Sequence, residues 1–298
     1  MRSNAVRVIV LLLLLLTLMC LVPSAALLPD ALAEDAAAFV ALPIDNSFGK
    51  KPNLDGYLPN NGGYEDESIS VSISMDRAYD TNIMIAWVRI ADPSQIRTTM
   101  AGNYGSTSLA PAATIAKRVN AVFAVNGDYY NFDGRGYLVR QGHRYRKNIR
   151  ANTDLLAIDD QGNLHIFASG QPDEASGLNI INTFNFGPAL VIDGELGTRL
   201  DFGGIGGHKP TQRMVICQSE PLNYLFIATE GPENKGSRGL TIPEMANYAM
   251  SLGVRVAYNL DGGSSSTMVL HNQKINSLSS GKIRSVADII YFATLEKR

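Results

Sequence analysis

Alternation of polar and apolar residues is the feature that most limits the fold of this 298-residue chain. From Ser68 to Met75 every second residue is a serine and the others are apolar, which is the two-residue period of a β-strand with one buried face. Further apolar runs of strand length follow and are bounded by turn residues. These runs are 83–90, 121–125, 153–158, 164–168, 187–192, 214–219, 224–229 and 254–260. Asp193-Gly194, directly after the run 187–192, is a predicted hairpin turn. The chain is therefore predicted to be rich in strands.

Helical patterns are fewer. The clearest begins at Thr241, a predicted N-cap, with Pro243 in the first turn and Glu244 completing a capping box. Gly253 is the expected stop. A second segment, 111–119, also has apolar residues at helical spacing.

No change of composition divides residues 69–292. Residues 69–298 are therefore expected to form a single strand-rich α+β domain, with a mixed central sheet and a few packed helices. Residues 34–68 are rich in proline, glycine, asparagine and acidic residues, and they predict a segment that leads into the domain and either wraps it or stays mobile.

The N-terminus has the pattern of an export signal. Arg2 and Arg7 precede an apolar run of 15 residues, Val8–Val22, and the small-residue sequence Ala31–Ala33 fits a cleavage site. The run is shorter than the roughly 20 residues of a spanning helix, which favours a cleaved signal peptide over residues 1–33. The long gap before Ala31 keeps an uncleaved membrane anchor as the alternative. Either way, the domain is predicted to be secreted or otherwise extracytoplasmic.

Charge and cysteine content narrow the chemistry. The formal net charge of −2 provides no global field for nucleic acid, so no such partner is expected. Cys20 lies in the apolar run, so Cys217 is alone in the domain and is predicted to be a buried apolar residue without a disulfide. The four histidines lack His-x-x-x-His spacing, so no zinc site is predicted, and no cofactor is assigned.

The strand after the clearest helix ends in polar residues. Alternation places Asn259 and Asp261 on one face of this strand. The residues that follow are Gly262, Gly263, Ser264 and Ser265. Glycines allow close backbone approach, and successive amides and hydroxyls suit phosphate oxygens. A carboxylate beside anion donors is therefore predicted here.

Taken whole, these segments resemble the signature of the phosphodiester glycosidase family. The resemblance lies in Gly239–Met245 and Asn259–Met268. It extends over most of the chain, from about Ile69 to Phe292, through Val125–Asn131, Asn185–Leu190, Pro210–Arg213 and Arg284–Val286. Asp128 is a departure, because it replaces the second glycine of the family's Asn-Gly-Gly segment.

The resemblance implies hydrolysis of a sugar-1-phosphate diester in a glycan or phosphoglycan. Chemistry at C1 passes through an oxocarbenium-like transition state, which a carboxylate stabilises, and Asp261 is the first candidate for that task. The phosphate leaving group departs with negative charge and needs cations and amide donors. Arg213, with its planar guanidinium, and the loop Gly262–Ser265 are predicted to hold it.

The turn at Asn126 and Asp128 is the second candidate site. Asp128 is expected to act as a second catalytic carboxylate, or with Asn126 as an oxygen ligand set for Ca²⁺, whereas the plain alternative is a polar turn. Both motifs end strands with polar residues, so Asn126 and Asp128 are expected to approach Asp261 in space. Arg284 and His208 are further candidates for binding substrate.

Three other function classes fit the sequence less well. The serines lack the G-x-S-x-G elbow of serine hydrolases, and no Walker sequence is present. A non-catalytic glycan-binding protein with the same fold is the remaining alternative, because Asp128 departs from the family pattern.

Overall fold

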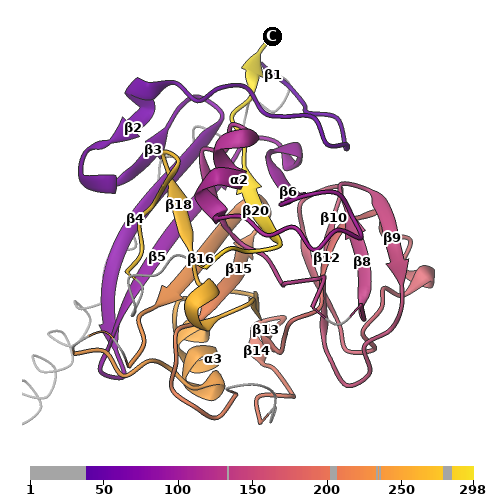
Figure 1. Ribbon diagram of the computed structural model, residues 1–298, viewed down its shortest axis with the longest axis vertical. Coiled ribbons are helices and arrows are strands. Elements are labelled where there is room, and N and C mark those ends of the chain that lie inside the picture. Colours follow the sequence, from indigo (N-terminus) through magenta and orange to yellow (C-terminus); the bar gives the residue numbers. More distant parts are fainter. Residues whose placement is uncertain (1–37, 133, 202–206, 233, 235, 278–283) are drawn as a thin grey trace, which may run out of the picture. The chain divides into compact units, whose positions relative to one another are not determined.

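The computed structural model describes residues 38–298, apart from 133, 202–206, 233, 235 and 278–283 (Figure 1). The predicted export signal, residues 1–33, lies outside the described residues. Within the described part of the chain, no helix combines the length and the apolar character needed to cross a bilayer.

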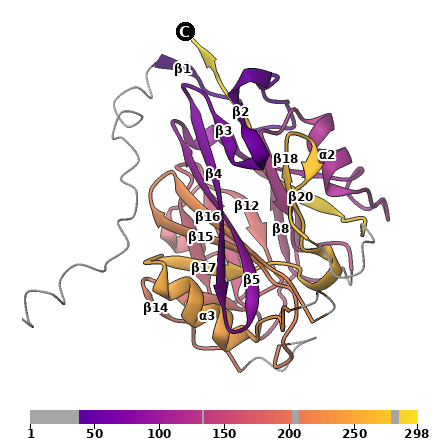
Figure 2. The ribbon, with the colours of Figure 1, turned by 90° about the vertical axis from the view of Figure 1, so that its left-hand side faces the viewer.

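A nine-stranded sheet forms the largest part of the fold (Figures 1 and 2). In spatial order its strands are β14 (Glu195–Leu196), β13 (Ala189–Ile192), β17 (Val256–Asn259), β15 (Met214–Glu220), β16 (Asn223–Thr229), β5 (Thr81–Ile90), β4 (Ile69–Ala78), β3 (Gly63–Glu65) and β2 (Tyr57–Leu58). The predicted lead-in segment thus contributes β2 and β3, which extend this sheet beyond β4.

A five-stranded sheet packs against it. Its strands are β19 (Gln273–Lys274), β18 (Met268–Leu270), β7 (Phe123–Asn126), β20 (Asp288–Phe292) and β6 (Ile96–Met100). Smaller groups are β11 (Leu164–Phe167), β10 (Leu155–Asp159) and β12 (Ile180–Phe184), the ribbon β8 (Tyr137–Arg140) and β9 (His143–Lys147), and the pair β1 (Phe39–Val40) and β21 (Glu296–Lys297). Short 3-10 turns are Leu54–Gly56, Pro59–Asn61, Pro93–Gln95, Glu174–Ser176 and Gly263–Ser265.

The main core lies between the two large sheets. Phe123 of β7, Phe226 of β16 and Phe292 of β20 meet there, and the ring of Phe226 lies 5.5 Å from Phe123 and 5.6 Å from Phe292 between centroids. Helix α3 (Ile242–Ser251) covers the outer face of the nine-stranded sheet, and α2 (Ala112–Arg118) covers the five-stranded one. Cys217 is fully buried beneath α3, as predicted for a small apolar residue.

Local sequence signals are confirmed where they were strongest. The capping box of Thr241 and Glu244 forms at the start of α3. The turn Asp193-Gly194 joins β13 and β14 as a two-residue hairpin, with φ angles of 51° and 86° that suit this turn type. The serine-alternating segment is β4, whose register pairs every residue with β5.

The prediction of a mixed central sheet is wrong. Every strand pairing in the described residues is antiparallel. The helices α2 and α3 do connect strands that run in the same direction, β6 to β7 and β16 to β17. In each case an antiparallel strand, β20 or β15, lies between the two. The domain is therefore mostly β, with two α-helices in the described residues.

Candidate active site

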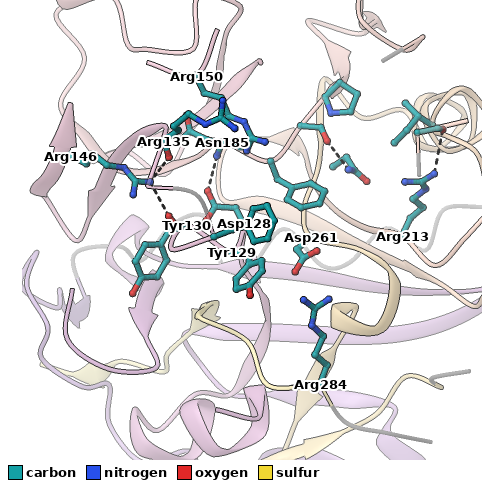
Figure 3. Close-up of a pocket in the computed structure, with 17 residues that line it drawn as sticks. Asp128, Tyr129, Tyr130, Arg135, Arg146, Arg150, Asn185, Arg213, Asp261 and Arg284 are labelled. Carbon is teal, nitrogen blue, oxygen red and sulfur yellow. Dashed lines mark hydrogen bonds between the residues drawn. The ribbon is translucent and has the colours of Figure 1, made fainter. Parts of the chain in front are cut away.

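A cavity of about 380 Å³ lies where β7 and β17 end, at the meeting of the two large sheets (Figure 3). Its described lining combines five arginines, two aspartates and four aromatic rings. The charged and aromatic residues are Arg135, Arg146, Arg150, Arg213, Arg284, Asp128, Asp261, Tyr129, Tyr130, Phe132 and Phe186. Excess positive charge and aromatic faces suit an anionic ligand that carries a ring.

Asn126 ties the two strand ends together. Its Oδ1 accepts a hydrogen bond of 3.0 Å from the amide of Thr267, and its Nδ2 donates to the backbone oxygens of Asp261 at 2.7 Å and Gly127 at 3.2 Å. The predicted approach of this turn to Asp261 is confirmed. Because all polar atoms of its side chain are used on backbone, Asn126 positions the loop and does not contribute a group to the cavity lining.

Asp261 places a partly buried carboxylate in the cavity. Burial raises its pKa above the ordinary value of 3.8, and the nearby negative charge of Asp128 adds to this rise. The Ser265 hydroxyl, the Arg284 charge and the Gly262 amide act in the opposite direction. In Figure 3 the guanidinium of Arg284 points toward this carboxylate.

Asp128 is held in a buried ionic network. Its Oδ1 lies 2.9 Å from Arg140 Nη2, and its Oδ2 accepts from the amide of Asn185 at 2.7 Å. The same Arg140 nitrogen contacts Asp288 Oδ2 at 2.6 Å, and all three charged side chains are buried. Because the two carboxylate oxygens of Asp128 already bind Arg140 and the Asn185 amide, Asp128 does not form a Ca²⁺ ligand set with Asn126. Within the described residues, no group of three His, Cys, Asp or Glu side chains is arranged to hold a metal ion.

The backbone between these carboxylates is closely fitted. A Cβ on Gly127 would lie 2.4 Å from Asp288 Oδ1, so only glycine fits beside the buried carboxylate. Tyr129 has a φ of 58°, a conformation that non-glycine residues adopt at a cost of about 1–3 kcal/mol. Arg284 lies 5.4 Å from the centre of the Tyr129 ring, a cation–π contact at the cavity wall.

Arg213 lines the cavity on the side opposite Arg146 (Figure 3). Its Nε donates to the Leu240 oxygen at 2.9 Å and its Nη2 to the Lys209 oxygen at 3.0 Å. Burial lowers its pKa to about 10, so it stays charged at neutral pH. Its guanidinium is therefore held in place by backbone carbonyls before any ligand binds.

Asn259 also faces the cavity. Its Nδ2 donates to the Gly187 oxygen at 2.8 Å, which fixes the orientation of the amide. In the described part of the chain its buried Oδ1 has no hydrogen-bond partner. A buried acceptor without a partner is energetically costly, so this oxygen is a suitable acceptor for a hydrogen bond from a ligand hydroxyl.

The glycine–serine loop lies behind Asp261. The described lining of the cavity does not include Gly262, Gly263, Ser264 or Ser265. The amide of Gly263 donates to Gln212 and that of Ser265 to Gly262, while the hydroxyl of Ser265 supports Asp261. His208 is exposed beside Gly207, which does line the cavity.

Three cavity arginines were not predicted from the sequence. Arg135, Arg146 and Arg150 line the side near Asp128. A local signal for them exists, because residues 135–150 contain six lysines and arginines and no acidic residue, in a chain with a net charge of −2. Such a cluster marks an anion-binding face.

Comparison with known proteins identifies the class. The chain belongs to the phosphodiester glycosidase family, whose family model matches residues 119–293. Among curated proteins it is 26% identical, over 196 residues, to the SPbeta prophage-derived uncharacterized protein YomE of Bacillus subtilis. That match covers 63% of this chain and 30% of YomE, so the chain spans about a third of its relative.

Solved structures share the fold. The catalytic domain of zebrafish N-acetylglucosamine-1-phosphodiester alpha-N-acetylglucosaminidase, auto-inhibited by its pro-peptide, matches with a TM-score of 0.61 at 16% identity, covering 76% of this chain and 83% of that one. A hypothetical protein from Synechocystis matches with a TM-score of 0.60 at 16% identity, over 76% of this chain and 62% of that one. A putative exported protein from Burkholderia pseudomallei K96243 matches with a TM-score of 0.51 at 15% identity, over 72% and 74%.

Proposed function

We propose that the protein is an extracytoplasmic hydrolase that cleaves a sugar-1-phosphate diester in a glycan or surface polymer and releases the sugar. The observation that carries this proposal is a partly buried carboxylate, Asp261, in a cavity lined by five arginines and aromatic rings. Family membership supports a glycosidase-type activity, and the zebrafish enzyme of similar fold is named for a substrate of this chemical class.

The positive charge of the cavity lining suits the cleavage of a phosphodiester bond. A phosphodiester has a negative charge before cleavage, and the departing phosphate gains another. Fixed guanidinium groups such as Arg213 stabilise that increase without rearranging, because backbone carbonyls already hold them. A neutral glycoside would gain little from five arginines, so the lining favours the phosphodiester.

The chemistry assigned to Asp261 takes place at C1 of the sugar. The bond from C1 to the phosphate oxygen breaks, and both electrons remain on that oxygen. Ionised Asp261 either attacks C1, to form a glycosyl ester that water then hydrolyses, or takes the proton from the water that adds directly to C1. Since phosphate is already a good leaving group, the oxygen that departs from C1 does not require protonation by a strong acid.

The remaining site residues are assigned to binding. The unpartnered Oδ1 of Asn259 accepts a hydrogen bond from a sugar hydroxyl, and the Tyr129 ring packs against the face of the sugar. Asp128, with both oxygens occupied by Arg140 and Asn185, is assigned to shaping the cavity and setting its charge. His208 and the loop of Gly262 to Ser265 lie outside the lining and are assigned supporting roles only.

Turnover is the direct test. Residues 34–298 are incubated with a panel of synthetic sugar-1-phosphate diesters, beginning with N-acetylglucosamine-1-phosphodiesters, and free sugar is measured. Release of sugar by the parent and not by Asp261→Asn supports the proposal. Binding of a diester without turnover of any panel member contradicts it, and favours the glycan-binding alternative.

Extracytoplasmic location is tested separately. Support for it comes from the charged N-terminus and the apolar run Val8–Val22. In fractionated bacterial cells that express the full chain, the domain is expected outside the cytoplasm. Recovery of soluble full-length protein from the cytoplasm contradicts the export part of the proposal and leaves the enzymatic part unaffected.

A further inference from the structure

A continuous series of aromatic rings leaves the cavity at Tyr130. The ring of Tyr130 lies 6.4 Å from that of Tyr104, which lies 4.8 Å from Tyr145, which in turn lies 4.5 Å from His143. We refer to these four residues as the aromatic strip. Tyr130 lines the cavity, whereas Tyr104 is 39% exposed and His143 is exposed on β9. The strip thus runs from the cavity to the protein surface.

Tyr104 needs an explanation, because it is 39% exposed, whereas Tyr130 is buried and Tyr145 is half-buried against the same small core cluster. The only described ring contacts of Tyr104 are with Tyr130 and Tyr145. Aromatic faces stack on the C–H faces of sugar rings, and a phenol hydroxyl can also bond to sugar hydroxyls. Neighbouring rings of the strip contact one another at interplanar angles of 23° for Tyr130 and Tyr104, 33° for Tyr104 and Tyr145, and 66° for Tyr145 and His143, so they form one continuous aromatic cluster.

The surface around the strip is basic. Tyr145 and His143 belong to the segment 135–150, with six lysines and arginines and no acidic residue. Arg146, next to Tyr145, lines the cavity, and its Nη2 donates to the backbone oxygen of Tyr130 at 2.9 Å. Glu174 opposes this charge from outside the segment, since its carboxylate lies 3.6 Å from Lys147 Nζ and also faces Arg144. Arg140 of the same segment is buried and paired with Asp128 and Asp288, so it adds no charge to this surface. The other five cations of the segment are opposed by Glu174 and leave an excess of positive charge.

We propose that the aromatic strip is a subsite for an anionic glycan chain that extends from the cavity, so that the natural substrate is an oligomer or polymer with phosphate or carboxylate groups along its length. Sugar rings of the chain stack on Tyr104 and Tyr145, while its anionic groups face the basic segment 135–150. The assignment rests on the proposed function for the scissile bond and adds the substrate class.

Binding tests the subsite without requiring turnover. The probe is a tetramer of sugar-1-phosphate units joined by phosphodiesters, compared by calorimetry with a neutral tetrasaccharide of the same sugar, with inorganic polyphosphate and with a single-stranded oligothymidine of equal charge. The tetramer is expected to bind the chain of residues 34–298 at least tenfold more tightly than each of the others, with an affinity that falls as salt is raised. Equal binding of the neutral sugar or of polyphosphate overturns the assignment, and tighter binding of oligothymidine favours a nucleic acid partner instead.

Matched variants locate the subsite. Tyr104→Ala is expected to lower affinity for the tetramer about tenfold, whereas Tyr79→Ala, an equally exposed tyrosine in the β4–β5 turn, leaves it unchanged. Arg144→Gln is expected to weaken both the affinity and its salt dependence, with Arg255→Gln as the control for an exposed arginine outside the segment. Affinity that is unchanged in Tyr104→Ala overturns the proposal even if both charge variants bind less well.

Kinetics separates this proposal from the proposed function. For the parent, kcat/KM on the tetramer is expected to exceed that on a single diester at least tenfold, and the ratio falls in Tyr104→Ala. Turnover of the single diester without preference for the tetramer overturns the subsite and leaves the enzyme assignment standing. Tight, Tyr104-dependent binding of the tetramer without any turnover would support the subsite and contradict the enzyme assignment.

Discussion

The side-chain amide of Asn126 donates a hydrogen bond of 2.7 Å to the backbone oxygen of Asp261, 135 positions further along the chain. This bond joins the end of β7 in the five-stranded sheet to Asp261, two residues after the end of β17 in the nine-stranded sheet. The position of the Asp261 carboxylate therefore depends on how the two sheets pack. The side chain of Asn126, together with the bond from the Asp261 amide to the Gly127 oxygen, joins the two strand ends at the cavity.

Replacing Asn126 should destabilise the protein and misplace the carboxylate. Asn126→Ala leaves the buried amide of Thr267 and the oxygens of Asp261 and Gly127 without this partner. The free energy of unfolding is expected to fall by about 3 kcal/mol, since each buried group that loses its partner costs about 1–3 kcal/mol. Urea unfolding measures this. Asn247→Ala, which removes an exposed asparagine on α3, should change it by less than about 0.5 kcal/mol.

Asp261→Asn should abolish most turnover and little binding. The amide keeps the shape of the carboxylate but cannot attack C1 or accept the proton of water. A fall in kcat of at least about a hundredfold is expected, or about 2.7 kcal/mol of transition-state stabilisation, with KM changed less than about threefold. Asp193→Asn, in the exposed hairpin turn, serves as the control. A kcat within about tenfold of the parent would show that another group provides the carboxylate chemistry.

The acid limb of the pH profile should follow Asp261. Burial raises its pKa above 3.8, so the ionised form, and with it kcat/KM, is lost as pH falls through a value above that of an ordinary aspartate. The positive charge of Arg284 lowers this pKa. Arg284→Gln should therefore shift the acid limb to higher pH, whereas Arg255→Gln, in an exposed turn, should leave it in place. A shift to lower pH in Arg284→Gln would contradict the assignment of the limb to Asp261.

Arg140 should be essential for folding stability. It is the buried partner of both Asp128 and Asp288, so Arg140→Met leaves two carboxylates buried without a cation. Loss of one partner of a buried ion pair costs about 3–5 kcal/mol. The triple variant Arg140→Met, Asp128→Asn, Asp288→Asn should recover much of this loss, because it removes the unpaired charges.

The pH dependence of the Arg140→Met variant provides an internal check. Burial raises the pKa of Asp288 in the folded protein, and the Arg140 charge opposes this rise, so Arg140→Met should raise the pKa of Asp288 further. A raised pKa in the folded state means that the neutral carboxyl favours folding, fully at low pH, and that this contribution is lost as pH rises through the folded value. The destabilisation by Arg140→Met, measured by urea unfolding, should thus be smaller at pH 5 than at pH 7.5. Equal losses at both values would mean that the cost is one of packing alone.

Much of the fold could be predicted because its signals are local. The serine alternation before Met75, the capping box at Thr241 and the Asp193-Gly194 hairpin each lie within a few residues, and each forms as expected. The type of sheet could not be predicted in this way. Whether β6 pairs with β7 or takes β20 between them depends on a strand about 165–190 positions away in sequence.

The site residues also divide into those with a local sequence signal and those that depend on distant partners. Asp261 and Asn259 follow from alternation along one strand, and their partner turn at Asn126 follows from its polar strand end. Asp288 has no such signal, because it is a single acidic residue at the start of an apolar strand and its partner Arg140 lies 148 positions away. The cavity arginines of segment 135–150 had a visible signal in the local excess of basic residues.

Gly127 and Asp288 should be energetically coupled. A Cβ at residue 127 would lie 2.4 Å from Asp288 Oδ1 and within 2.5 Å of the other carboxylate atoms, and the carboxylate cannot move away while Arg140 holds it at 2.6 Å. Gly127→Ala should therefore cost about 1–3 kcal/mol of unfolding free energy, the usual range for overpacking. In the Asp288→Ala background the obstructing atoms are absent, so the same Gly127→Ala substitution should cost less by at least about 1 kcal/mol, a coupling that a double-mutant cycle measures directly. Gly197→Ala is a useful comparison, because its Cβ would meet the backbone oxygen of Ala189 at 2.2 Å and removal of Asp288 should give it no relief. If Gly127→Ala costs the same in both backgrounds, the glycine is needed for backbone conformation and not to make room for the buried carboxylate.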